Sequence, residues 1–160
     1  MRSIGRQHTL NRITGAGNCT AGWKCYAYRT FLSEASLMSL TGRCHCGRNA
    51  FEINGELPQA LTRCTCSICS KRGHLYAYYD PEVFEVTQAD SDAIYRWQTR
   101  LVANHFCSAC GCDLYADSPA FTPDGKWDGK TRRIAVNARL LDDFEAADYP
   151  VTVVDGKHLW

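Results

Sequence analysis

The chain has 160 residues, of which 45% are hydrophobic and 22% are charged, as in an ordinary water-soluble globular protein. Its net charge of +1 gives no reason to expect nucleic-acid or membrane binding, and no apolar run approaches the roughly 20 residues of a membrane span. Ten cysteines are the unusual feature, because they indicate either disulfides in a secreted protein or thiolate metal sites in a reducing compartment.

The first 37 residues differ in character from the rest, with five basic residues against one acidic residue, Glu34. Such a start is typical of a transit peptide, of a disordered tail, or of upstream sequence that is not normally translated. We predict a basic, disordered extension over residues 1–37 and a domain over residues 38–160. Because the extension lacks the apolar region of a secretory signal, we expect a cytoplasmic protein. Its Cys19 and Cys25 match no short zinc motif and stay unassigned.

From Gly42 onward the pattern is mostly that of short β-strands. Stretches rich in aromatic and β-branched residues occupy residues 50–53, 74–79, 83–87, 94–99, 133–138 and 151–155. Turn signals such as "TPDGK" and "VDGK" separate them. One short helix fits residues 138–146, where Leu140 or Leu141 meets Phe144 at helical spacing. The pattern predicts a mainly β domain of antiparallel sheets with short helical turns, stabilised by zinc.

The eight cysteines of this domain fall into three groups. They are the C-x-C pair Cys44 and Cys46, the C-x-C-x-x-C trio Cys64, Cys66 and Cys69, and the C-x-x-C pair Cys107 and Cys110, followed by Cys112. Cysteines so close in sequence are poor disulfide partners for each other and good ligands of one metal ion, so we favour metal over disulfides. Tetrahedral zinc needs sulfurs roughly 3.8 Å apart, and both spacings permit that distance.

Two pairs of cysteines make one closed zinc site. The natural assembly joins the first pair to the last, and its four ligands are Cys44, Cys46, Cys107 and Cys110. A closed site with four thiolates contributes folding energy and leaves no position for a substrate. We therefore predict a structural zinc on these residues, which would tie the first strand to the middle of the chain.

The remaining trio, Cys64, Cys66 and Cys69, has no obvious fourth ligand nearby. A zinc held by three thiolates keeps one position open, which is typical of catalytic or ligand-exchanging sites. An incoming thiol there would lose its proton, and water could take the same place. Two alternatives stay open: the trio could close with Cys112 into a second structural site, or its cysteines could be redox-active or metal-free thiols.

Histidines and tyrosines flank these cysteines. His74 is a candidate proton shuttle, or a residue that simply hydrogen-bonds within the fold. His45 and His105 are expected to pack beside metal ligands rather than to be ligands. Tyr76 and Tyr78 are expected in the core, with the lining of a pocket as the alternative.

Five segments occur in the domain in this order: "GRCHCGRNAFEI", "CTCSICSKRGH", "HFCSACGCDLY", "AVNARLLDD" and "DGKHLW". Together they resemble the glutathione-dependent formaldehyde-activating enzymes, a family that includes centromere-protein-V-like proteins, from about Thr41 to Trp160. The resemblance implies a β-tent fold shared with the Mss-four-like proteins. It also implies two zinc ions per chain, a structural one on the four paired cysteines and a functional one on the trio.

The resemblance further implies an activity and its partners. Members of the family join glutathione and formaldehyde into S-(hydroxymethyl)glutathione and are classed as carbon–sulfur lyases. On that basis we expect a zinc-dependent enzyme that binds a thiol such as glutathione and a small aldehyde, with the trio as its catalytic site. Basic residues beside the trio are candidates for the glutathione carboxylates: Arg63, Lys71 and Arg72. The alternative is a zinc-stabilised binding module without catalysis.

Overall fold

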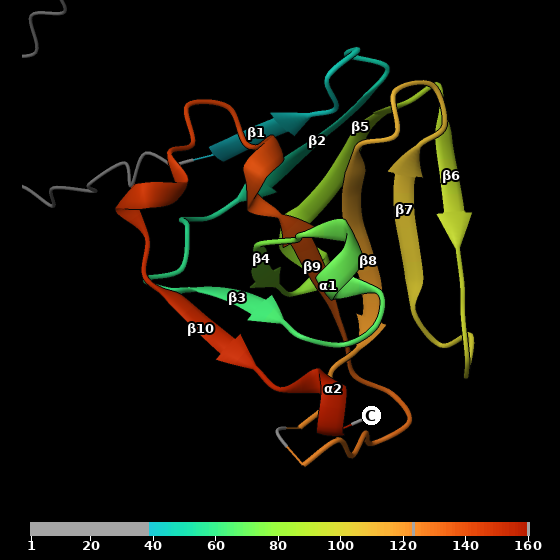
Figure 1. Cartoon of the computed structure of the whole chain (residues 1–160). Helices are drawn as coiled ribbons and strands as arrows, with labels where there is room; N and C mark the ends of the chain where they lie inside the picture. Colours follow the sequence, from blue (N-terminus) through green and yellow to red (C-terminus); the bar gives the residue numbers. More distant parts are fainter. Residues whose placement is uncertain (1–38, 123, 160) are drawn as a thin grey trace, which may run out of the picture. The chain divides into compact units, whose positions relative to one another are not determined.

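The computed structural model of the chain describes residues 39–122 and 124–159, which form ten strands in two sheets with short helical segments (Figure 1). The mainly β fold that the sequence predicts is confirmed. The expected extension over residues 1–37, with Cys19 and Cys25, lies outside the described residues. In the described part of the chain, no helix is both long enough and apolar enough to cross a membrane.

The smaller sheet has three antiparallel strands in the order β1-β2-β5. They are β1 (Ser39–Arg43), β2 (Asn49–Asn54) and β5 (Phe84–Ala89). Alternate side chains of β2 point to opposite faces, and its buried set is Asn49, Phe51 and Ile53. This alternation is the signal that predicted a strand at residues 50–53.

The larger sheet has seven strands in the order β10-β3-β4-β9-β8-β7-β6. They are β3 (Leu61–Cys64), β4 (Tyr76–Tyr79), β6 (Asp92–Tyr95), β7 (Ala103–Cys107), β8 (Asp113–Pro119), β9 (Arg132–Asn137) and β10 (Val151–Val154). Neighbouring strands are antiparallel except for β10 and β3, which pair in parallel at one edge. The sequence predicts antiparallel sheets, and the parallel pairing of β10 with β3 is an exception to that prediction.

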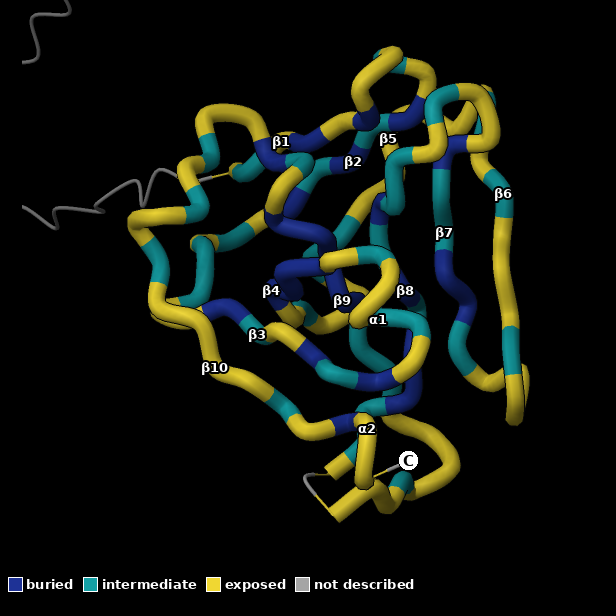
Figure 2. The backbone as a smooth tube through the Cα atoms, viewed as in Figure 1, coloured by how far each residue is buried: buried dark blue, intermediate teal, exposed yellow. Residues whose placement is uncertain are grey.

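The main core lies between the two sheets. Phe51 and Ile53 of β2 meet Ile134 and Val136 of β9 in one buried cluster, and the tube in Figure 2 shows the buried positions along these strands. Burial of such apolar side chains is the largest favourable contribution to folding. The opposite face of the larger sheet is free of the smaller one and carries a separate cluster built around Tyr76.

The helix expected at residues 138–146 does not form. Two short 3-10 turns, Ala138–Leu140 and Ala146–Asp148, stand in its place. Between them Leu141 makes a β-bridge to Gly42, and the Asp142 backbone N–H donates to the carbonyl of Thr41 over 2.9 Å. Because these backbone groups pair with β1, they cannot pair along a helix, and tertiary pairing overrides the local helical pattern.

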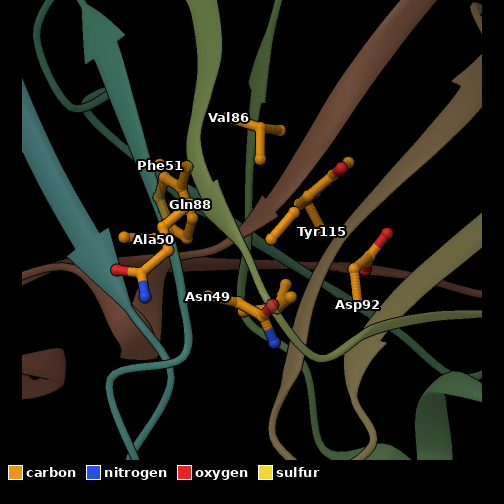
Figure 3. A pocket seen from close by; sticks show the side chains of 9 residues that line it. Asn49, Ala50, Phe51, Val86, Gln88, Asp92 and Tyr115 are labelled. Atoms are coloured by element: carbon orange, nitrogen blue, oxygen red, sulfur yellow. The ribbon is translucent and has the colours of Figure 1, made fainter.

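A small void lies beside β2, with Asn49, Phe51 and Tyr115 among its lining residues (Figure 3). Its volume of about 10 Å³ corresponds to roughly one water molecule. The side-chain Nδ2 of Asn49 is buried there without a hydrogen-bond partner. The void is therefore a packing feature next to a polar side chain, and it is too small for a substrate.

Candidate metal centres

Two groups of cysteines could each hold a metal ion. The first consists of the residues that the sequence paired, Cys44, Cys46, Cys107 and Cys110, whose sulfurs all lie within 4.8 Å of one another. The Sγ of Cys46 is 3.5 Å from that of Cys44 and 3.6 Å from that of Cys107. These separations fit the roughly 3.8 Å of a tetrahedral thiolate site.

Two matching turns present this cysteine quartet. After β1, the Gly47 N–H donates to the carbonyl of Cys44 (3.0 Å), and after β7 the Gly111 N–H donates to that of Cys107 (2.8 Å). Both glycines have φ near +75°, at 74° and 77°, which only glycine adopts without strain. The Asn49 N–H donates to the Cys44 sulfur over 3.4 Å. Hydrogen bonds of this kind stabilise a thiolate and fix its direction.

The second group is the trio Cys64, Cys66 and Cys69, whose sulfurs also lie within 4.8 Å of one another. Cys64 ends β3 and Cys69 begins the short helix α1 (Cys69–Arg72). Within the described ranges, no fourth cysteine, histidine or carboxylate ligand atom joins this group. Cys112, the alternative fourth ligand, instead lies beside the quartet, where its carbonyl accepts from the Cys107 N–H (2.8 Å).

The thiols of Cys64 and Cys69 differ in acidity. Hydrogen bonding from Cys69, and from the backbone N–H of Cys66, lowers the pKa of Cys64 to about 5 although burial opposes this. The hydrogen bond between Cys69 and Cys64 raises the pKa of Cys69. Burial and the negative charges of Cys66 and Cys64 raise it further. One thiolate therefore forms readily, while further ones need a cation to compensate their charge.

All eight cysteines of residues 39–122 and 124–159 are free thiols. The sulfurs converge in one group of three and one group of four, which favours metal binding over disulfide bonds. Thiolates are soft ligands, and both cysteine groups therefore fit a metal ion such as zinc.

A chain of polar side chains leads away from the trio. The Tyr76 hydroxyl lies 3.9 Å from the Cys69 sulfur and 2.5 Å from Nδ1 of His74. The Nε2 of His74 is 3.3 Å from Asp113, which also forms an ion pair with Arg72 at 2.7 Å. Burial, followed by the charge of Cys69, raises the pKa of Tyr76, so its hydroxyl stays protonated near neutral pH. Sequence reasoning missed Asp113, because nothing in "CDLY" indicates which residues it will face.

The basic residues expected to contact glutathione occupy different settings. Arg72 is half-buried in its ion pair with Asp113, and Lys71 is exposed on α1. Arg63 is exposed and alternates with Cys64 along β3, so the two side chains leave opposite faces of the strand.

The remaining histidines have settings of their own. The Nδ1–H of His105 donates a hydrogen bond to the Asp92 carboxylate (2.8 Å), and the ring stacks on Tyr115, with 4.3 Å between the centroids. His45 is exposed between two members of the quartet. Neither joins a cysteine group as a ligand in the described part of the chain.

Removal of the Tyr76 hydroxyl should weaken metal binding by the trio. Since residues that hydrogen-bond to metal ligands typically contribute 10- to 100-fold to affinity, we expect Tyr76→Phe to lose about tenfold. The measurement is chelator competition on the zinc-loaded protein. Tyr78→Phe is the matched control, because it deletes the same atom two residues along β4. Equal affinities of both variants and wild type would contradict this role, even if Tyr76→Phe lowers stability.

Comparisons with known proteins agree with this arrangement. Residues 39–149 match the family described as glutathione-dependent formaldehyde-activating enzyme. A protein of Halomonas elongata, provisionally named as such an enzyme, is 35% identical over 91 residues, or 51% of this chain and 58% of that protein. A crystal structure of a Rhodobacter sphaeroides protein aligns with a TM-score of 0.56 and 26% identity, covering 70% of this chain and 99% of that one. The chain thus spans somewhat more than half the length of that Halomonas protein.

Proposed function

The chain belongs to the glutathione-dependent formaldehyde-activating enzyme family, and on this basis we propose that it is a zinc-dependent carbon–sulfur lyase. Its reaction would join a thiol, glutathione in the first instance, to a small aldehyde such as formaldehyde, and would also run in reverse. The free thiols favour a reducing compartment, so we place the protein in the cytoplasm.

The observation that carries this proposal is the contrast between the two cysteine groups. The quartet supplies four sulfurs, the full set for a structural zinc, whereas the trio supplies three. A group of three ligands suits a site where an external molecule completes the coordination. We therefore assign the structural zinc to the quartet and the functional zinc to Cys64, Cys66 and Cys69. Zinc bound at the trio would lower the pKa of a coordinating thiol.

The surroundings of the trio would assist the reaction by position and by exclusion of water. Cys69 packs against a buried cluster formed by Tyr76, Ala116 and Ala135. Buried side chains beside the trio keep water away from it, and exclusion of water strengthens electrostatic interactions. In the forward direction the sulfur of the thiolate forms a bond to the carbonyl carbon, the C=O double bond becomes a single bond, and the oxygen takes up the proton that the thiol released. Since this addition is already easy in water, we expect orientation of the two reactants to supply most of the acceleration.

The carboxylates of glutathione would need cationic partners near the trio. The sequence nominates Arg63, Lys71 and Arg72 as candidates. We propose Lys71 and Arg72 as contacts, whereas Arg63 leaves β3 on the face opposite to Cys64. Arg72 already faces Asp113 at 2.7 Å, so its contact with substrate would have to be shared with that carboxylate. Lys71 is exposed and has room to swing toward a bound anion.

Exchange NMR on mixtures of formaldehyde and a thiol tests this function directly. We expect the zinc-loaded protein to accelerate the interconversion of glutathione and S-(hydroxymethyl)glutathione, with smaller effects on cysteine or 2-mercaptoethanol. Protein stripped of metal by a chelator is the control. If the exchange rate is the same with and without the protein for every thiol, the chain is a zinc-stabilised binding module rather than a lyase.

A further inference from the structure

We propose that Arg133, stacked on Tyr78, forms a carboxylate-binding subsite next to the trio. Its ligand would be a carboxylate of the thiol substrate. The inference deepens the proposed function and depends on it, because it concerns how the far end of that thiol is held. It adds a residue that the sequence did not nominate.

The register of the larger sheet places this pair on the face that carries the trio. Tyr76 and Tyr78 are two residues apart on β4 and therefore share a face, and Tyr76 contacts Cys69 on it. Tyr78 is directly opposite Ala135 of β9, and Arg133 lies two residues before Ala135 on the same face. The core between the two sheets lies on the other face.

The guanidinium of Arg133 lacks an acidic partner. Its Cζ lies 4.4 Å from the centroid of the Tyr78 ring, and its Nε is buried without a hydrogen-bond partner. Neighbouring Arg132, by contrast, is held by Asp117 at 2.7 Å. No ion pair forms at Arg133 within the described parts of the chain. A partly buried guanidinium without an acidic partner is a favourable partner for a planar carboxylate.

A broad, open hollow of about 370 Å³ lies beside this pair. The residues that line it come from the end of β4, the start of β9 and the segments beside them: Tyr78, Tyr79, Asp80, Val83, Ala120, Thr131, Arg132 and Arg133. Of the two arginines in this lining, Arg132 is paired with Asp117, so Arg133 is the one that can meet an anion.

Successive contacts through two tyrosines connect the trio to Arg133. The Tyr76 hydroxyl lies 3.9 Å from the Cys69 sulfur, the Tyr76 and Tyr78 ring centroids are 6.0 Å apart, and Cζ of Arg133 lies 4.4 Å from the Tyr78 centroid. A residue of extended chain spans about 3.3–3.6 Å, so a peptide thiol can place a carboxylate roughly 7–10 Å from its sulfur. A small thiol without carboxylates cannot use this contact.

The Tyr78 ring lies near both the Tyr76 ring and the guanidinium of Arg133. Burial raises its pKa to about 12, the guanidinium of Arg133 opposes that shift, and the sulfurs of the trio reinforce it. The phenol therefore stays neutral at physiological pH, and its ring face remains available to hold the guanidinium.

The test separates binding of the carboxylates from binding of the thiol. S-methylglutathione keeps both carboxylates but has no free thiol, so its binding to the zinc-loaded full chain by calorimetry reports the carboxylate contacts without a thiolate bond to zinc, and the variants show the share of Arg133. We expect Arg133→Gln to bind it about 10- to 100-fold more weakly than wild type. Arg133→Lys, which keeps the charge without the planar fork, should fall between them. Lys130→Gln removes the same charge three residues away and should bind as wild type does.

The outcomes are distinguishable. Equal binding by wild type and Arg133→Gln, equal losses in Arg133→Gln and Lys130→Gln, or no binding by wild type at millimolar S-methylglutathione would each overturn the subsite. The exchange experiment with 2-mercaptoethanol, which has a thiol and no carboxylate, reports the proposed function without involving Arg133. Binding that depends on Arg133 in a protein that accelerates no exchange would leave the subsite standing and refute the lyase activity.

Discussion

Cys107→Ser should abolish the folded state of the domain. Cys107 is completely buried at the end of β7, and its sulfur lies 3.6 Å from that of Cys46, which follows β1. A metal bound at the quartet would therefore link the two sheets. Structural zinc contributes roughly 10–16 kcal/mol to folding in small domains, whereas a whole domain is stable by only about 5–15 kcal/mol. Loss of one ligand should thus lower the free energy of unfolding by an amount comparable with the total.

Circular dichroism and zinc analysis of the purified variant check this result. We expect loss of the β signal and less than one zinc per chain. Cys112→Ser is the matched control, because it is a neighbouring cysteine that packs beside the quartet without joining it. That variant should stay folded with two zinc ions. A Cys107→Ser protein that unfolds at the wild-type temperature would show that the quartet has no structural role.

Strands with a clear alternation of apolar residues are visible in the sequence. β2, β4, β9 and β10 all lie within or beside the stretches that the sequence predicts. β8, with the sequence DLYADSP, was missed because its residues are mostly polar or small. It forms a strand because β7 and β9 both pair with it. Partner strands supply the hydrogen bonds there, and the local sequence contributes little.

The ends of elements depend on backbone details that periodicity does not contain. The stretch at residues 94–99 predicts a strand, yet β6 stops at Tyr95. Further on, Gln98 and Arg100 have φ of 44° and 60°, which is incompatible with an extended strand. The parallel pairing of β10 with β3 is equally hidden, since alternation is the same in parallel and antiparallel neighbours.

The spacing of the cysteines predicts which of them lie together. It does not predict which other side chains surround each group. The spacing of Cys64, Cys66 and Cys69 forces proximity, and the structure brings their sulfurs together. Asp113 reaches His74 only because the sheet places the start of β8 near α1. For Arg133 a signal was present: two adjacent arginines begin an alternating strand, so one of them must take the face opposite the other.

Cys66→Ser should differ from Cys107→Ser in keeping its fold. We expect it to lose one zinc ion and its activity while the domain stays folded. The sulfur of Cys66 belongs to the trio, and the trio lies outside the core cluster between the sheets. Serine has a similar size but is a poor zinc ligand, so the second metal should be lost while the quartet keeps its own. Elemental analysis should fall from two zinc ions to one.

Ser67→Ala is the control for this variant, because Ser67 is the exposed neighbour of Cys66 and is not a member of the trio. It should keep two zinc ions and the wild-type exchange rate with glutathione and formaldehyde. In Cys66→Ser the exchange rate should drop to that of the uncatalysed mixture, with an unchanged dichroism spectrum. Unfolding of Cys66→Ser would instead mean that both metals are structural. In that case the missing fourth cysteine would be a feature of the fold and would no longer indicate a place for substrate.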